Sequence, residues 1–556
     1  MTRASLVTTI VALWSQAFLV QSDIPFSDIT TDAGITFIHN SGATGQKYLP
    51  ETLGAGGLFI DIDSDGWQDI FLVNSVDWES TDGRSLPALY RNDGDGTFTD
   101  ITSGSGLEVE LYGIGGAAAD YDNDGHTDIY ITAFGPNRLF RGHGDGTFTD
   151  VTQATGVGGE GFSTSAAWLD YDNDGALDLF VANYVEWTIT GDLVCTLDGQ
   201  NKSYCTPEAY QGQSPTLYHN KGDGTFEDVT TLSGLDDRSS KGLGVAMLDY
   251  DRDGWLDLFV ANDTEPDRLY RNEGDGTFVD VGVVAGVAYS EGGVARAGMG
   301  VDAADYDRSG RPSLVVGHFS NEMIALYHNE GNGLFIDEAP RSAVGRASLL
   351  TLAFGCFFFD YNLDGHLDLF AVNGHVADDI EDVQSRVTYA QPPHLFRSLG
   401  DGSFEEVTPP AGTALADAMV ARGAAYADID RDGDLDLLVT VNDGAARLLR
   451  NEAGQENNVL RVHTIGTVSN RDGIGARVEV TVGDGPPRWL LVKTGSSYAS
   501  QSELALTFGL GAAAAADMVR VVWPSGQVDT VIGVAANQQI TIREGAGIVE
   551  ASPLGY

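Results

Sequence analysis

One acidic nine-residue loop is repeated seven times along the chain, and this repetition limits the possible folds more than any other feature. The copy Asp249–Asp257 carries carboxylates at positions 1, 3, 5 and 9 and glycine at position 6, and it leads into the apolar run Leu-Phe-Val-Ala. The seven copies begin at Asp61, Asp120, Asp170, Asp249, Asp305, Asp360 and Asp428. Self-similarity at a period of roughly 50 residues is typical of propellers, solenoids and repeat arrays.

Each repeat contains four short runs of β-branched and aromatic residues. A Gly/Ala-rich segment such as Gly242–Leu248 precedes the acidic loop, and a Leu-Tyr-Arg-Asn motif, as at Leu269–Asn272, follows it. In the first six copies a Gly-Asp-Gly-type turn and a Thr-Phe-x-Asp-Val-type run come next, as at Gly274–Val281. Four short strands without helical periodicity form a propeller blade. The sequence therefore predicts an all-β, seven-bladed β-propeller; the alternative, a parallel β-helix, has shorter coils than these repeats.

The last repeat lacks its fourth strand, and the N-terminus supplies a match. After Leu448–Asn451 no Thr-Phe-x-Asp-Val run follows, whereas Pro25–Thr30 reads Pro-Phe-Ser-Asp-Ile-Thr. We predict that this N-terminal strand completes the seventh blade and closes the ring, because an open array would expose an unpaired strand edge. The predicted domains are a signal peptide (1–22), the propeller (23–455), a small C-terminal β domain (456–546) and a tail (547–556).

The acidic loops have the composition of calcium sites. Calcium takes six to eight oxygen ligands, which alternate residues of a tight turn can supply, and glycine at position 6 permits the positive φ of such a turn. The predicted ligands are Asp61, Asp63, Asp65 and Asp69; Asp120, Asp122, Asp124 and Asp128; Asp170, Asp172, Asp174 and Asp178; Asp249, Asp251, Asp253 and Asp257; Asp305 and Asp307; Asp360, Asn362, Asp364 and Asp368; and Asp428, Asp430, Asp432 and Asp436.

Position 7 of the loop varies freely, which is typical of a backbone-carbonyl ligand. The fifth loop has Ser309 and Ser313 in place of two carboxylates, so we expect it to bind weakly or stay empty.

We expect about five to seven Ca2+ ions with a structural role, because binding free energy adds to fold stability. The alternative is a set of solvated acidic turns, but four carboxylates in one turn repel each other strongly without a cation.

The three long insertions share one face of the predicted propeller. In a four-stranded antiparallel blade the acidic loop joins strands 1 and 2, whereas Ser75–Pro87, Tyr184–Pro215 and Gly374–Pro393 all join strands 2 and 3 on the opposite face. Loop length placed on one face favours a recognition surface for an extracellular protein or glycan. Its aromatic residues either bind such a partner or form the core of the insertions; they are Trp78, Tyr184, Trp187 and Tyr210.

Charge and the N-terminus limit partners and location. With 81 acidic against 31 basic residues, the net charge of −50 excludes nucleic acid and anionic membrane surfaces as partners. Arg3 and the apolar run Leu6–Val20 predict a cleaved signal peptide, with an uncleaved anchor as the alternative. We therefore expect a secreted protein without membrane insertion after cleavage, periplasmic or cell-surface in a bacterial host. Cys195 and Cys205 lie ten positions apart, so we expect a local disulfide between them. Cys356 stands in an apolar run, so we expect it to be buried.

The repeats resemble the FG-GAP/VCBS calcium-binding repeats of integrin α-subunit propellers. The C-terminal part resembles the ASPIC/UnbV domain, and the whole chain is similar to the cartilage acidic protein family. The motifs that carry the second resemblance are Gly475–Val480, Gly495–Ser502, Phe508–Gly511 and Val522–Gly526. The resemblance implies a seven-bladed propeller with calcium in its underside loops and a role in extracellular interaction. It implies no established reaction.

Two functions fit the sequence. The first is a secreted, calcium-binding recognition or adhesion module, with no catalytic residue and no organic cofactor. The alternative is a propeller-scaffold enzyme acting on extracellular polysaccharide or through a transition metal at the insertion face. Its candidate residues are His318, His375 and His394, with Asn183, Glu186 and Glu265 nearby. Convergence of the three histidines would favour the enzyme. The serines of Gly495–Ser502 are expected to cap turns, since no nucleophile elbow accompanies them.

Overall fold

Seven four-stranded antiparallel sheets make up most of the chain in the computed structural model, which describes residues 25–78 and 85–555. The first six follow chain order: β2–β5 (Gly57–Ile60, Asp69–Leu72, Ala88–Asn92, Phe98–Asp100), β6–β9 (Tyr112–Ala119, Asp128–Phe134, Arg138–Gly142, Phe148–Asp150), β10–β13 (Ser163–Leu169, Asp178–Asn183, Thr216–Asn220, Phe226–Asp228), β14–β17 (Gly242–Leu248, Asp257–Asn262, Arg268–Asn272, Phe278–Asp280), β18–β21 (Gly298–Ala304, Ser313–His318, Ala325–Gly331, Leu334–Asp337) and β22–β25 (Ala353–Phe359, Asp368–Asn373, His394–Ser398, Phe404–Glu406). The predicted signal peptide and residues 79–84 of the first insertion lie outside the described residues.

The seventh sheet contains both ends of the propeller. Its strands are β26 (Ala421–Ala427), β27 (Asp436–Val441), β28 (Arg447–Asn451) and the N-terminal β1 (Phe26–Asp28). Phe26 pairs with Asn451 and Asp28 with Leu449. This confirms the prediction that the N-terminal strand completes the seventh blade. The first strands of successive sheets contact one another in order, and β2 of the first blade contacts β26 of the seventh.

The asparagine of the Leu-Tyr-Arg-Asn motif joins neighbouring blades. The Nδ2 of Asn272 donates to the carbonyl of Leu256 in its own blade and to that of Tyr171 in the preceding blade, at 3.2 and 2.7 Å. Asn92 makes the same bond from the first blade to Ile429 of the seventh, at 2.8 Å. The motif therefore fixes one blade against the next.

Short helices lie only in the connections of the described chain: α1 (Thr152–Thr155), α2 (Gly282–Ala285), α3 (Ala343–Ser348) and α4 (Ile380–Val383), with six 3-10 turns at Leu49–Thr52, Ile189–Gly191, Pro207–Ala209, Ala339–Arg341, Ala414–Ala416 and Gly454–Glu456. Among the residues that the structure describes, none of these helices has the length and apolar character needed to cross a bilayer.

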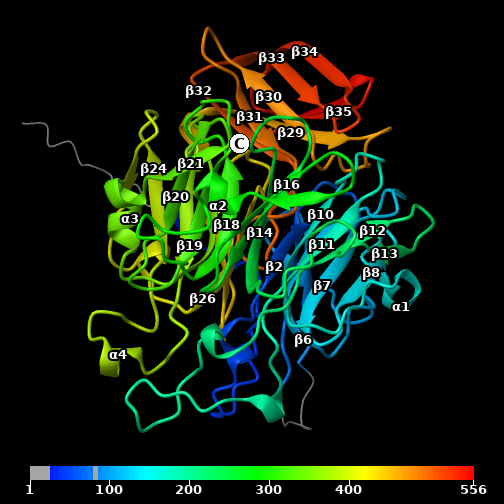
Figure 1. The fold of residues 1–556 in the computed structure, drawn as a ribbon. Helices are drawn as coiled ribbons and strands as arrows, with labels where there is room; N and C mark the ends of the chain where they lie inside the picture. The colour runs from blue at the N-terminus through cyan, green and yellow to red at the C-terminus, as the bar shows by residue number, and fades with distance from the viewer. Residues whose placement is uncertain (1–24, 79–84, 556) are drawn as a thin grey trace, which may run out of the picture.

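The C-terminal domain consists of two more four-stranded sheets. One has the order β32-β29-β35-β36 (Leu506–Gly511, Asn458–Ile465, Gln538–Arg543, Gly547–Pro553), and the other the order β31-β30-β33-β34 (Arg488–Leu491, Arg477–Thr481, Ala515–Val522, Val528–Ala535). The segment predicted as a tail thus forms β36 and belongs to this domain. Figure 1 shows the domain, orange to red, at one end of the propeller, with α4 and the long insertions at the opposite end.

A loop of the C-terminal domain, residues 494–503, runs along the centre of the propeller; we call it the axial loop. Ser497 exchanges two backbone hydrogen bonds with Val301 of the fifth blade, and the Gln501 side chain exchanges two with Ala118 of the second. The Tyr498 hydroxyl, fully buried, donates to the carbonyl of Leu53 at 2.7 Å. The C-terminal domain is therefore anchored at the centre of the propeller.

Small residues in the first strands leave space for the axial loop. A Cβ on Gly115 would lie 2.6 Å from the Cβ of Ala499, and one on Gly423 would lie 2.1 Å from Ser500 Oγ. Convergence of the blades alone does not account for these small residues, since the space holds another segment. Ser500 and Ser502 do not cap turns as predicted: Ser500 Oγ accepts from Gly57 N–H at 3.2 Å and Ser502 Oγ from Tyr426 N–H at 3.1 Å.

Candidate metal centres

All seven acidic loops adopt one backbone conformation. In the fourth copy φ is 64° at Arg252 and 94° at Gly254, and positions 4 and 6 are positive in every other copy. The Asp249 carboxylate accepts from the N–H of Gly254 at 3.1 Å, which closes the turn. The positive φ at position 6 was predicted from its glycine. The positive φ at position 4, where the residue is not glycine, was not predicted. The conformation persists in the fifth loop, so it does not require the full set of carboxylates.

The position-9 aspartate holds the backbone of its own blade. Asp257 is fully buried and accepts from Tyr250 N–H through one oxygen and from Asn272 N–H through the other, both at 2.9 Å. Burial raises the pKa of the equivalent Asp69 to about 8 and of Asp128 to about 9. This residue therefore has two roles, because it fastens the loop to the third strand and faces the other carboxylates.

Carboxylate oxygens converge at the centre of the loops. Within each of four groups, one oxygen per residue lies within 4.8 Å of the others. These groups are Asp61, Asp63 and Asp69; Asp120, Asp122 and Asp128; Asp170, Asp172 and Asp174; and Asp249, Asp251 and Asp257. The sequence prediction placed these side chains at common sites, and the structure brings them together.

Several of these oxygens are buried without a hydrogen-bond partner among the described residues. They are Oδ1 of Asp61, Asp63, Asp122, Asp172, Asp360 and Asp428, in loops one, two, three, six and seven. A buried polar atom without a partner is costly. Burial, followed by repulsion from Asp364, raises the pKa of Asp360 to about 7. A cation at the loop centre would supply the missing partner and oppose this rise, so the donor set fits Ca2+.

The third residue of the Leu-Tyr-Arg-Asn motif lies beside the acidic loop, which the sequence reasoning missed. In the second blade Arg141 contacts Asp122 and Asp124 at 2.6 Å each. In the third, His219 Nδ1 lies 3.1 Å from Asp178 Oδ1, and this hydrogen bond raises the pKa of His219 to about 9. The signal was present, because this position holds Arg or His in all seven copies.

In the fifth loop, histidine and serine side chains take the place of two acidic groups. His328 Nε2 bonds to Asp307 Oδ2 at 2.8 Å, and the Oγ of Ser313 replaces a carboxylate by accepting from Asn329 N–H at 3.1 Å. Neither Asp305 nor Asp307 has a buried oxygen without a partner in the described part of the chain. The expectation that this loop binds weakly or stays empty remains a prediction.

The seventh loop has one more carboxylate than predicted. Asp434, at position 7, is buried, and neither of its oxygens has a hydrogen-bond partner among the described residues. Burial, and then repulsion from Asp436, raises its pKa to about 11. Position 7 was expected to contribute only its backbone carbonyl.

The C-terminal domain contacts three of the acidic loops. Arg461 lies 3.3 Å from Asp428 and 2.6 Å from Glu503 of the axial loop, all three buried. The carboxylate of Asp472 accepts from Asp120 N–H at 2.8 Å, and Gly511 N–H donates to the carbonyl of Leu363 at 3.1 Å. Loops two, six and seven therefore lie at the interface of the two domains.

The opposite face does not bring the three histidines together. His318 bonds to the carbonyl of Met323, His375 to Ser320 Oγ, and His394 to Glu406 at 3.0 Å. No described contact joins any two of them. The described contacts therefore give no support to a shared transition-metal site for these histidines. The neighbouring polar residues are also engaged, since Asn183 Nδ2 donates to the carbonyl of Ser214 and Glu265 pairs with Lys241.

The insertions instead pack on one another. The aromatic residues form a core, with Trp78 stacked on Tyr112 at 4.2 Å and Trp187 and Tyr184 buried. Ser203 of the third-blade insertion donates to Asp379 of the sixth-blade insertion at 2.9 Å. The predicted disulfide Cys195–Cys205 is present, and Cys356 is buried.

Two family models match the chain. The FG-GAP-like repeat matches residues 61–131, 120–181, 192–260, 249–316 and 377–439. The model described as ASPIC and UnbV matches residues 466–549. Together these matches include six of the seven acidic loops in whole or part and most of the C-terminal domain.

Curated relatives include cartilage acidic protein 1 of Homo sapiens, 27% identical over 356 residues, which cover 63% of this chain and 48% of the relative. The Xenopus tropicalis protein of the same name is 28% identical over 294 residues, covering 52% of this chain and 42% of the relative. The chain thus matches less than half the length of these relatives.

Among solved structures, a lectin from Burkholderia pseudomallei gives a TM-score of 0.43 at 12% identity, covering 72% of this chain and 97% of that one. An Agrocybe aegerita lectin that recognises non-reducing terminal N-acetylglucosamine gives 0.40 at 16% identity, covering 71% and 87%.

Proposed function

Because the chain belongs to the FG-GAP-repeat proteins, here with a C-terminal ASPIC/UnbV domain, we propose that it is an extracellular calcium-binding module that recognises another protein. The propeller fold is that of the family. Calcium binding, the recognition role and the extracellular location are the proposed parts, and each is supported by separate observations.

One observation carries the calcium assignment: five loops contain a buried carboxylate oxygen with no partner among the described residues. The fifth loop, where histidine and serine replace the acidic partners, contains none. The fourth loop contains none either, and its assignment rests on the convergence of Asp249, Asp251 and Asp257. Hard oxygen ligands at alternate residues suit Ca2+ better than a softer transition metal. The principal ligands are the aspartates at positions 1, 3 and 5, oriented by the position-9 aspartate.

Calcium in this position has a structural role. Each ion would bind at a turn that joins two strands of a blade, and loops two, six and seven also contact the C-terminal domain. Binding to the folded state alone adds stability, about 2.7 kcal/mol per site at a concentration 100 times Kd.

Thermal unfolding with and without calcium tests this assignment. We expect the melting temperature to rise with Ca2+ and to fall after chelation, with five or six ions per chain in isothermal titration calorimetry. Mg2+ at the same concentration serves as the control, because it demands stricter octahedral geometry. A melting temperature that is unchanged by chelation contradicts the structural role.

The insertion of the third blade supports a protein partner. Its exposed apolar side chains gather around the disulfide and are Ile189, Leu193, Val194 and Leu197, exposed by 48, 43, 77 and 41%. Exposed apolar groups in a polar surround are typical of protein interfaces. The aromatic residues that would stack on a sugar are instead used in the core of the insertions. The nearby exposed Asp198 and Glu208 favour a partner with a basic surface.

The extracellular location is supported by the disulfide, because such bonds persist in oxidising compartments. It is further supported by the high acidic charge, which favours solubility.

A matched pair of surface variants tests the recognition face. Val194→Glu places a charge in the insertion, where Val194 is 77% exposed. Val468→Glu places one in the C-terminal domain, where Val468 is 71% exposed. We expect cross-linking to an extracellular-matrix protein to be lost in the first variant and retained in the second. Equal retention by both, or binding to a glycan array that Val194→Glu leaves unchanged, contradicts a protein interface at this face.

A further inference from the structure

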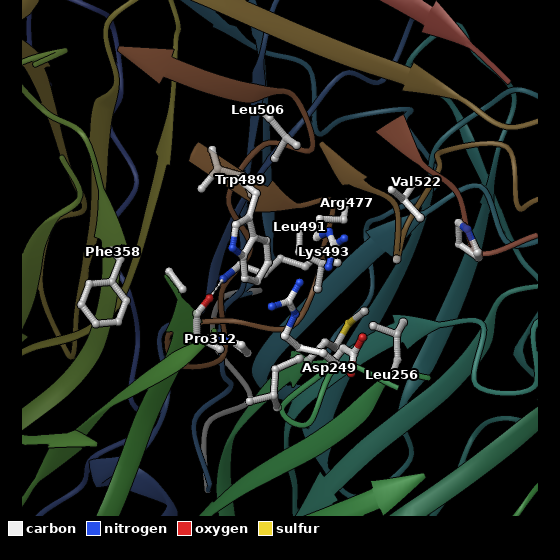
Figure 2. Close-up of a pocket in the computed structure, with 18 of the residues that line it drawn as sticks. Asp249, Leu256, Pro312, Phe358, Arg477, Trp489, Leu491, Lys493, Leu506 and Val522 are labelled. Carbon is white, nitrogen blue, oxygen red and sulfur yellow. Dashed lines mark hydrogen bonds between the residues drawn. The ribbon is translucent and has the colours of Figure 1, made fainter. Parts of the chain in front are cut away.

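A cavity of about 260 Å³ lies between the propeller and the C-terminal domain. It opens beside the fourth acidic loop, so that Asp249 and Arg252 line one side, while β30, β31 and β33 of the C-terminal domain line the other (Figure 2). For comparison, a cavity of about 150 Å³ accommodates benzene. Cavities at domain interfaces are common sites for small molecules.

The walls of the cavity are partly apolar. The propeller contributes Leu256, Pro312 and Phe358, and the C-terminal domain contributes Trp489 and Leu491. Figure 2 shows the Trp489 indole between the two domains, near the Leu491 and Lys493 side chains. The space therefore suits a planar apolar body somewhat larger than one benzene ring.

The charged groups that line the cavity are balanced in number, Arg252, Arg477 and Lys493 against Asp249, Asp253 and Asp360. Arg477 and Arg520 share a single carboxylate, Glu479, with N–O distances of 2.9 Å each, which leaves one positive charge over the three residues. Arg477 also has a buried Nε–H with no hydrogen-bond partner among the described residues. Lys493, by contrast, is paired with Asp302 and donates to the carbonyl of Ala303 at 2.9 Å.

Two acidic residues of the wall accept hydrogen bonds from their own loop. Asp249 accepts from the N–H groups of Asp253 and Gly254 at 3.0 and 3.1 Å, and Asp253 accepts from Trp255 N–H at 2.9 Å. The third, Asp360, keeps one buried oxygen without a partner among the described residues. An anion in the cavity would find a spare donor in the Nε–H of Arg477. Arg252 lines the wall on the propeller side.

We propose that this cavity is a binding site for a small aromatic carboxylate. Its ring lies between Trp489 and the apolar residues of the propeller, and its carboxylate accepts from Arg477. The site depends on both domains and is separate from the recognition face, while Asp249, Asp253 and Asp360 of its wall belong to the candidate calcium loops.

Binding of 2-naphthoate, measured by isothermal titration calorimetry in calcium buffer, tests the proposal. The neutral analogue 2-naphthalenemethanol has the same ring system and is the matched probe. We expect 2-naphthoate to bind at least tenfold more tightly, because a charge-assisted hydrogen bond to a buried donor discriminates by about that factor.

Two variants each remove one ion pair with Glu479. The substituted residue lines the cavity in one variant and lies outside the lining in the other. Arg477→Gln removes the donor in the cavity and is expected to weaken 2-naphthoate binding about tenfold. Arg520→Gln breaks the equivalent pair outside the cavity lining and should leave binding within about twofold. Leu491→Trp fills the space and should abolish binding of both probes.

Equal affinity for the acid and the alcohol, equal weakening by Arg477→Gln and Arg520→Gln, or unchanged binding in Leu491→Trp would each overturn the proposal. Melting temperatures of the three variants in calcium separate a local effect from loss of folding. Since the probes do not compete with calcium, failure here leaves the calcium assignment intact.

Discussion

The fifth and seventh acidic loops share a backbone but differ in the groups at their centre. Both have positive φ at positions 4 and 6 and close with the glycine N–H bonded to the first aspartate. In loop five His328 and Ser313 satisfy the remaining groups. In loop seven Asp428 and Asp434 retain buried oxygens without partners in the described chain. The turn is therefore encoded by glycine and hydrogen bonding, while the demand for a cation depends on the side chains.

Removal of the position-9 side chain is expected to have the largest effect. Asp436→Ala leaves the N–H groups of Ile429 and Asn451 without their acceptor, which should cost about 3 to 5 kcal/mol of unfolding free energy. Ser313→Ala in loop five removes one neutral acceptor and should cost about 1 kcal/mol. Urea unfolding in chelator measures both; equal costs would show that the two loops are held alike.

Loss of ligands should remove one ion only from loop seven. Asp430→Asn combined with Asp432→Asn is expected to lower the Ca2+ stoichiometry by one and the unfolding free energy in saturating calcium by about 2 to 3 kcal/mol. Asp305→Asn combined with Asp307→Asn should leave the stoichiometry unchanged. Calorimetric titration supplies the count, and a loss of one ion in the loop-five variant would contradict the assigned difference.

Restoring the missing carboxylates should convert loop five. Ser309→Asp combined with Ser313→Asp recreates the common pattern at an unchanged backbone. We expect one additional Ca2+ per chain, with a stability gain of about 1 kcal/mol in calcium and a loss in chelator, where the new charges repel. The control Ser309→Asn adds an oxygen without charge. No gain of an ion would show that Pro312 or His328 prevents binding.

The smallest effect concerns the pH dependence of loop seven without metal. The pKa of Asp434 is raised, so the folded protein binds this proton more tightly than the unfolded chain does. The contribution to stability is present below the unfolded pKa near 4 and decreases as pH rises above it. Asp434→Asn should therefore increase stability in chelator at pH 8 more than at pH 4. An effect independent of pH, measured by thermal unfolding, would contradict this assignment.

Repetition explains which parts of the structure could be predicted. The match of Pro25–Thr30 to a strand absent from the seventh copy located the N-terminal strand, and the fixed register of the aspartates located the carboxylate clusters. Features that occur in only one repeat, or outside the repeats, could not be predicted by comparing copies. The axial loop and Asp434 depend on contacts between distant segments, which no local pattern encodes. The contact of His219 with its acidic loop could have been predicted, because this position holds Arg or His in every repeat.

The axial loop also affects the order of folding. Gly57 and Ser500 form a hydrogen bond across 443 residues of chain, so the centre of the propeller is completed by a segment that is synthesised after all seven blades. Contacts of such sequence separation slow folding and prolong the exposure of unpaired strands. The blades can form during synthesis, but their common centre must remain solvated until the C-terminal domain emerges and docks.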